Sequence, residues 1–327
     1  MQWKLTKEEY DVLLSYVGCG NFPEADIIVF GNEEGTGGYS VEANAKARVN
    51  LYGRDEITGQ FLTCLKDGNW QNGFYEPNAY GGRRKVEKYI LPIEIKKNKF
   101  TKGVFNQTIA RLCLAIEDPS KDWFQGSSGS GATEWEEIKQ FVSKQLYRPR
   151  DGVQTALADW RPLPRPSERE ADWPKEEYSA ISLSTKNNPY LAFFNNPKRN
   201  RKKPSDFSNF QEDMKKRLEI LKNLFITSKA NVIIGIGGVS GFKKDALELM
   251  FEDIKFVPLE FNTADMFTRK NRELQVLTST ISLPNKNLQI FLIPFPEAGN
   301  VFKTQEDALN MLKELFVQYI NPIFKPC

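Results

Sequence analysis

Residues 231–238 read NVIIGIGG, an apolar run that ends in glycines. Apolar residues at helical spacing precede it, at Met214, Leu218 and Leu221, and a second helical pattern follows over 242–251. A strand that is apolar on both faces and lies between two helices is typical of a parallel sheet covered on both sides. This stretch therefore predicts an α/β fold.

Three further apolar runs extend the pattern, at 26–30, 153–160 and 288–296. A helix is predicted before the first of them, over 7–17, and another after the last, with Thr304 as its N-cap. The proline-rich residues 161–168 (RPLPRPSE) cannot continue a β-ladder, so the strand over 153–160 should leave Asp159 and Arg161 near its end.

The domain organisation follows from these runs. We predict one domain over 1–327, a three-layer α/β/α fold with a four-stranded parallel sheet. Residues 40–150 do not alternate strand and helix. We interpret them as an inserted α+β region that elaborates a cleft, with a strand in KYILPIEIKK and a helix in VFNQTIARLCLAI.

Composition narrows the chemistry. The chain has 327 residues, and its 45 Lys+Arg and 42 Asp+Glu give a net charge of +3, which says little about partners. It has no histidine, which excludes imidazole bases and ligands. Its four cysteines lack metal-binding spacing, so we expect no metal and no cofactor. It has no long apolar run and its N-terminus is charged, so we expect a cytoplasmic protein without a membrane span.

Ligands of open α/β sheets bind outside the carboxyl ends of the strands. Those ends are GNEEG (31–35), ADWRP (158–162), GIGGVSG (235–241) and FPEAG (295–299), and we expect them to converge on one cleft. In the first, Glu33 and Glu34 could activate water or stabilise a cationic transition state, or they could be solvated acids of a polar turn.

The glycines of 235–241 could offer backbone N–H groups to a phosphate, or they could form only a tight turn. The segment lacks the third glycine of a dinucleotide fingerprint, because Ser240 stands there, and it lacks Walker A spacing. The basic run 198–203 (KRNRKK) is typical of a solvated loop or of a DNA contact, and the aromatic residues in 69–80 could stack on bases or pack on the surface.

Taken together, the strand ends resemble those of the uracil-DNA glycosylase superfamily. In that family the first strand of a four-stranded parallel sheet ends in a G-x-[D/N/E]-P-G-like motif, and the last ends in an H-P-S-like motif. Residues 31–35 match the first, with Glu33 at the catalytic acid and Glu34 in place of proline. Residues 295–299 match the second, with Phe295 replacing His and Glu297 replacing Ser. Asp159 falls where the family carries its base-reading Asn.

The departures bear on the substrate. An ionised Asp only accepts hydrogen bonds, so Asp159 fits uracil poorly and suits the exocyclic amino group of cytosine. The inserted region could enlarge the pocket for a bulky 5-substituent. Within the superfamily the chain resembles bacterial anti-phage members, and this resemblance implies excision of glucosylated hydroxymethylcytosine from phage DNA.

This resemblance implies a monomeric, monofunctional DNA glycosylase that flips the target nucleotide and leaves an abasic site. The implied catalytic residues are Glu33, which orients water, Glu34 as the alternative for that role, and Asp159, which reads the base. The residues expected to contact the substrate are Gly31, Asn32, Gly35, Tyr39, Phe295, Pro296 and Glu297. Those expected to bind DNA phosphates are Gly237, Gly238, Ser240, Lys243, Lys244, Gly299 and Asn300.

Two alternatives stay open. The first is a DNA- or nucleotide-binding module of the same fold without catalysis, suggested by the missing His and proline. The second is a metal-dependent nuclease built on the E-x-K triplet Glu94-Ile95-Lys96.

Overall fold

The computed structural model describes residues 3–36, 40–52, 103–126, 132–147, 150–180, 188–200, 208–239, 241–252, 254–261, 275–299 and 301–325. The predicted strand in KYILPIEIKK, the aromatic residues in 69–80 and the triplet at 94–96 lie outside these ranges, as do residues 201–203 of the basic run.

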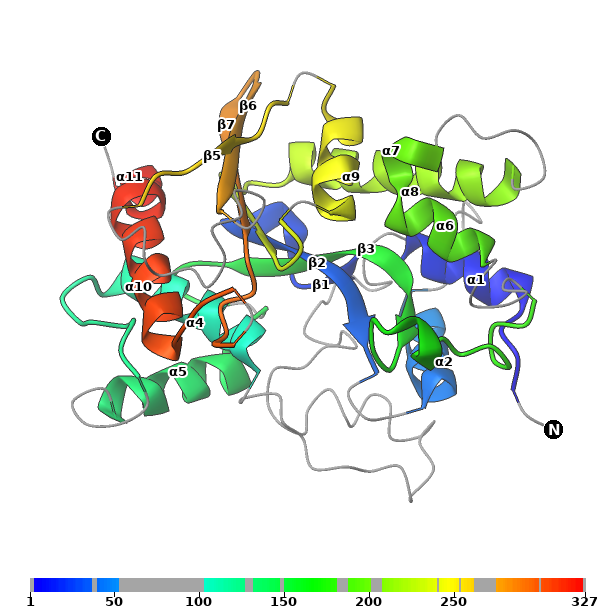
Figure 1. The fold of residues 1–327 in the computed structure, drawn as a ribbon, viewed down its shortest axis with the longest axis horizontal. Helices are drawn as coiled ribbons and strands as arrows, with labels where there is room; N and C mark the ends of the chain where they lie inside the picture. The colour runs from blue at the N-terminus through cyan, green and yellow to red at the C-terminus, as the bar shows by residue number, and fades with distance from the viewer. Residues whose placement is uncertain are drawn as a thin grey trace.

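A seven-stranded mixed sheet forms the centre of the fold (Figure 1). Its spatial order is β1-β3-β2-β4-β7-β6-β5. The four strands β3, β2, β4 and β7 are parallel, and β1, β6 and β5 are antiparallel additions at the two edges. In chain order the strands are β1 (Gly18–Cys19), β2 (Ile27–Gly35), β3 (Thr155–Arg165), β4 (Val232–Ile236), β5 (Val257–Pro258), β6 (Leu277–Leu283) and β7 (Lys286–Ile293).

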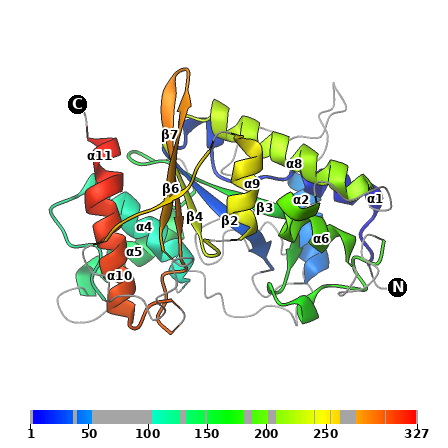
Figure 2. The same cartoon turned by 45° about the horizontal axis from the view of Figure 1, so that its top comes forward.

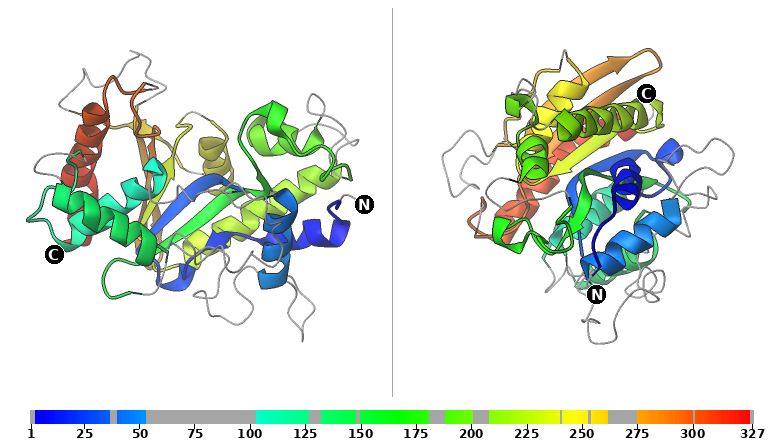
Figure 3. Two further views of the ribbon diagram at one scale, coloured as in Figure 1. Left: turned by 90° about the horizontal axis from the view of Figure 1, so that it is seen from below. Right: turned by 90° about the vertical axis from the view of Figure 1, so that its right-hand side faces the viewer.

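Helices cover both faces of the sheet (Figures 2 and 3), and the predicted α/β class is confirmed. On one side lie α4 (Val104–Glu117), α5 (Ala132–Lys144), α10 (Gln305–Leu315) and α11 (Asn321–Phe324). On the other lie α1 (Lys7–Ser15), α2 (Val41–Tyr52), α6 (Pro189–Asn195), α7 (Pro197–Asn200), α8 (Ser208–Thr227) and α9 (Phe242–Met250). Thr304 is the N-cap of α10, as predicted, and forms a capping box with Asp307.

The sheet separates two hydrophobic cores, and strand alternation assigns residues to them. In β2, Ile28 and Phe30 pack with α1, α8 and α9, whereas Ile27 and Val29 pack with α4, α5 and α10. All four side chains are fully buried. The parallel strands are therefore apolar on both faces, which is the pattern that predicted the fold.

Two strand ends differ from the prediction. The Gly-rich segment 31–35 continues β2, and β3 runs through the proline-rich segment to Arg165. The pairing of β2 with β3 explains both, because Gly31 lies opposite Asp159, Glu33 opposite Arg161, and Gly35 opposite Arg165, with a register shift after Glu33. The prolines of β3 therefore do not end its pairing with β2, which reaches Arg165.

The sheet is also wider than predicted, because β6 and β7 form an antiparallel hairpin that carries β5 at its outer side. Within the region 40–150, the described elements are helices α2, α4 and α5. In the part of the chain that the structure describes, no helix is long and apolar enough to cross a membrane.

Candidate functional site

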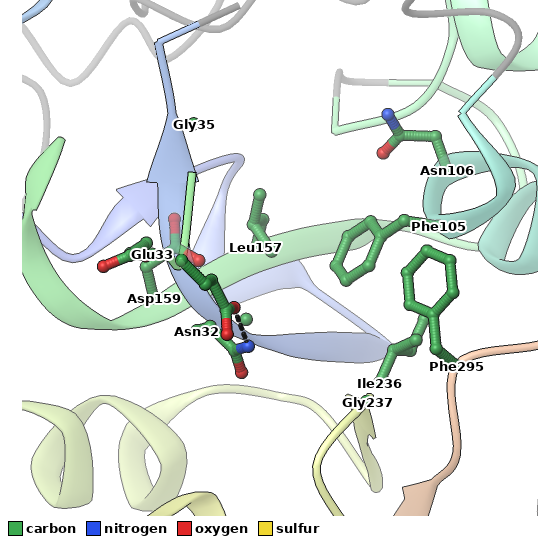
Figure 4. A pocket seen from close by; sticks show the side chains of 12 residues that line it. Asn32, Glu33, Gly35, Phe105, Asn106, Leu157, Asp159, Ile236, Gly237 and Phe295 are labelled. Atoms are coloured by element: carbon green, nitrogen blue, oxygen red, sulfur yellow. Dashed lines mark hydrogen bonds between the residues drawn. The ribbon is translucent and has the colours of Figure 1, made fainter. Parts of the chain in front are cut away.

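A cavity of about 270 Å³ lies at the carboxyl edge of the four parallel strands (Figure 4). The chain leaves β2 toward β3 on one side and continues through β4 toward β7 on the other, which makes the β2–β4 boundary a switch point where α/β proteins bind ligands. The cavity is lined by Gly31, Asn32, Glu33, Gly35, Phe105, Asn106, Leu157, Asp159, Glu168, Ile236, Gly237 and Phe295.

Glu33 is held by two arginines of the neighbouring strand. Its Oε2 lies 3.1 Å from Nε of Arg161, and its Oε1 accepts a hydrogen bond from Nε of Arg165. The Glu33 side chain is 4% exposed and both arginine side chains are 2% exposed. The three groups thus form a buried cluster whose geometry follows from the β2–β3 register.

Burial raises the pKa of the Glu33 carboxyl, and the positive charges of Arg161 and Arg165 act against that rise. The cluster is extended by Arg161, whose Nη1 donates to Oδ1 of Asn195 at 2.6 Å and whose guanidinium lies 4.5 Å from the ring centre of Phe242. Glu33 is therefore a fixed carboxylate rather than the solvated acid of a polar turn.

Asp159 lines the same cavity from β3 and is 3% exposed. Gly31 lies opposite it in the sheet, and a Cβ at position 31 would come within 2.1 Å of Asp159 Oδ1. The glycine after the apolar part of β2 therefore makes room for the Asp159 carboxylate. The backbone of Asp159 is fixed as well, since its N–H donates to Val17 O at 2.9 Å.

The two halves of the cavity differ in character. Glu33, Asp159 and Asn32 lie on one side, and the rings of Phe105 and Phe295 lie on the other (Figure 4). Nδ2 of Asn32 donates to Glu168, which is half-exposed at the mouth. A carboxylate side facing an aromatic side suits a flat ligand that carries hydrogen-bond donors on its edge.

The loop after β4 lines the cavity through Gly237. Gly237 and Gly238 have φ of +77° and +64°, values that favour glycine. Lys243, expected to bind a phosphate, is instead buried, and its Nζ donates to the carbonyls of Ile236 and Gly237, the latter at 2.9 Å. Burial lowers the pKa of Lys243 to about 7. Its amino group therefore holds the backbone of the loop and does not face the cavity.

The other predicted residues lie farther from the cavity or outside the described ranges. Lys244 pairs with Glu248 at 3.2 Å, and Glu297 is exposed and does not line the cavity. Pro296 is buried, and Gly299 adopts a φ of +87°. Tyr39, Ser240 and Asn300 lie outside the described residues, as does the side chain of Glu34.

Sequence reasoning missed Phe105, Asn106 and Glu168 as lining residues and the pairing of Arg161 and Arg165 with Glu33. The arginines carried a signal, because two cations directly after a predicted strand end need a carboxylate partner if they are buried. Among the described residues no cluster of His, Cys, Asp or Glu could hold a metal ion. No protein-family model, curated protein or solved structure matches the chain.

Proposed function

We propose that the protein is a DNA glycosylase that hydrolyses the N-glycosidic bond of a flipped, cytosine-type nucleotide. The observation that supports it is the convergence of Glu33, Asp159, Gly237 and Phe295, from or just after four parallel strands, on one cavity. Residues 31–35 end the first of these strands in chain order and residues 295–299 follow the last, in keeping with the resemblance to the uracil-DNA glycosylase superfamily.

Base recognition follows from the two sides of the cavity. Phe105 and Phe295 offer faces on which a flat ring packs, and Asp159 offers a carboxylate acceptor. The exocyclic amino group of cytosine is a donor, and an acidic side chain is its expected partner. A flipped cytosine would thus lie between the aromatic rings and Asp159.

Hydrolysis breaks the bond between C1′ and the base nitrogen, and a water oxygen forms the new bond to C1′. One water proton ends on the departing base, and positive charge develops on the sugar in between. Glu33 is the carboxylate we assign to stabilise that charge and to orient the water, because two arginines hold it in one position at the cavity. The product is an abasic site in an uncut strand.

We base two more specific proposals on the family resemblance. The substrate is glucosylated hydroxymethylcytosine in phage DNA, and the biological role is antiviral defence. The test is an abasic-site assay in EDTA with four DNAs that differ only in one base: cytosine, uracil, hydroxymethylcytosine or glucosylated hydroxymethylcytosine. We expect abasic sites in a modified-cytosine DNA alone. Abasic sites in the uracil DNA alone, or none in any DNA, would contradict the proposal.

Two variants assign the roles. Asp159→Asn replaces an acceptor by an amide and should lower the rate on the cytosine-type base by about a hundredfold, and Glu33→Gln should lower it at least as much. Glu176→Gln, an exposed acid outside the cavity, is the matched control and should keep full activity. Thermal unfolding of each variant separates lost chemistry from lost structure.

One observation favours a second candidate, a DNA-binding module without catalysis. Both oxygens of Glu33 face guanidinium groups, so the carboxylate that hydrolysis would need to orient a water is already occupied by Arg161 and Arg165. A protein of this kind would bind the modified DNA, yield no abasic sites, and keep its affinity in Glu33→Gln.

A further inference from the structure

A second cavity, of about 210 Å³, lies on the other side of the first turn of α4. It is lined by Val104, Gln107, Thr108, Arg111, Gly126, Trp135, Pro296, Gln305, Leu309 and Leu312. At two places in the chain, consecutive residues line the two different cavities. Phe105 lines the first and Val104 the second, and Phe295 lines the first and Pro296 the second.

Arg111 is the charged residue of this second cavity, and it is 5% exposed. Its Nη1 donates to the carbonyls of Trp123 and Gln125, the latter at 3.0 Å, and its guanidinium lies 5.7 Å from the ring centre of Trp135. Within the described ranges, Nε and Nη2 make no hydrogen bond and the guanidinium has no ion pair. Two donor groups of a buried cation are therefore unused beside an empty space.

Among the residues that the structure describes, no carboxylate pairs with Arg111. Asp122 acts on it electrostatically, but that carboxylate pairs with Lys313 at 2.7 Å. Burial lowers the pKa of Arg111 to about 10, so the side chain still carries its charge at neutral pH. A buried, unpaired charge is costly, and a bound anion would remove that cost.

The rest of the cavity fits an anion of limited size. A guanidinium presents parallel N–H donors that match two oxygens of a phosphate. Gln305 extends the polar lining, and its Nε2 already donates to Pro296 O at 3.3 Å. Helix α4 begins at Val104, which lines the cavity, and its N-cap Gly103 supplies no side-chain cap to the first N–H groups. Leu309 and Leu312 form an apolar wall.

We propose that this cavity is a phosphate-binding site anchored by Arg111. The phosphate could be a phosphodiester of a nucleic acid whose base occupies the neighbouring cavity, or it could belong to a separate phosphorylated small molecule. The site itself does not depend on the glycosylase proposal.

The experiment measures binding of inorganic phosphate and of deoxycytidine 5′-monophosphate by calorimetry, with deoxycytidine as the uncharged control. Arg111→Met removes the charge and keeps the apolar stem, and we expect at least about tenfold weaker phosphate binding. Leu309→Phe narrows the cavity without touching Arg111 and should also weaken binding. Lys255→Met, an exposed residue, matches the loss of charge and should bind as the native protein does.

Equal phosphate affinity in Arg111→Met and in the native protein would overturn the proposal, as would the absence of phosphate binding in the native protein. Competition between duplex DNA and inorganic phosphate would identify the phosphodiester source, and simultaneous binding of both would identify a separate phosphorylated molecule. None of these readouts requires turnover, so they test the phosphate site independently of the abasic-site assay.

Discussion

Four of the five arginines that are buried in the described part of the chain are held in three different ways. Arg161 and Arg165 share the carboxylate of Glu33. Arg217 is held by backbone oxygens, since its three nitrogens donate to the carbonyls of Leu14, Tyr16, Asp159 and Trp160. Arg111 uses only Nη1 in hydrogen bonds to the described residues, although it too lies almost wholly inside the protein.

This difference separates arginines that stabilise the fold from Arg111, which we propose binds a ligand. A carboxylate neutralises the first pair, and a ring of carbonyls that joins α1 to β3 satisfies Arg217. Both arrangements connect segments far apart in the sequence. Arg111 connects its own helix to a loop about a dozen residues away through Nη1. Its Nε and Nη2 donors make no hydrogen bond to the described residues.

The largest effect is expected for Glu33→Ala, which leaves Arg161 and Arg165 buried without their carboxylate. We expect the free energy of unfolding to fall by about 3–5 kcal/mol, measured by urea denaturation. Glu33→Gln keeps the shape and one acceptor, so its loss should be smaller. A loss below about 1 kcal/mol for Glu33→Ala would show that the cluster is not stabilised as a unit.

Arg217→Met should lower the free energy of unfolding by about 2–3 kcal/mol, because the variant leaves buried carbonyl oxygens without donors. Urea denaturation checks this value. Arg169→Met, at an exposed position, is the control and should change stability by less than about 0.5 kcal/mol. Equal effects of Arg217→Met and Arg169→Met would show that Arg217 does not stabilise the fold.

Lys243 extends the comparison to a buried amine that titrates. Its pKa falls from 10.5 to about 7 on folding, so between these values the unfolded chain holds a proton that the folded protein lacks. Stability from this group is therefore present above pH 10.5 and is lost as the pH falls toward 7.

We expect unfolding free energy to rise between pH 7.5 and 9.5 more steeply in the native protein than in Lys243→Met, by up to about 1.4 kcal/mol per pH unit. Urea denaturation across that range gives both slopes. Parallel curves would mean that the amine does not change its protonation on folding.

The smallest effect on stability is expected for Arg111→Met, within about 1 kcal/mol of the native protein. The two lost carbonyl contacts are offset because the variant no longer buries a charge. Denaturation in phosphate-free buffer checks this. A loss as large as that of Arg217→Met would instead assign Arg111 to the structural arginines.

Much of the fold could be predicted because the relevant signals are local. The apolar run at 231–238 and the cap formed by Thr304 and Asp307 both appear where expected. The extension of β2 through Gly31–Gly35 could not be predicted, since Gly, Asn and Glu disfavour strands and only pairing with β3 holds them extended. The hairpin strand Leu277–Leu283 could be predicted from the alternation in LTSTISL.

The candidate site also contains residues that the sequence could predict and residues that it could not. Glu33, Asp159 and Phe295 could be brought together in advance, because the ends of parallel strands share one edge. Phe105 arrives from α4, whose position depends on tertiary packing against the sheet. The pairing of Glu33 with Arg161 depends on the β2–β3 register, which neither strand specifies alone.

The alternating contacts of β2 also determine where the chain tolerates insertions and deletions. Removing one residue between Ile27 and Gly31 would turn each preceding side chain toward the opposite core, or would displace Gly31 from its place opposite Asp159. Removing two would keep the faces but lose the same alignment. In this strand the number of residues is therefore more tightly constrained than the choice among apolar side chains.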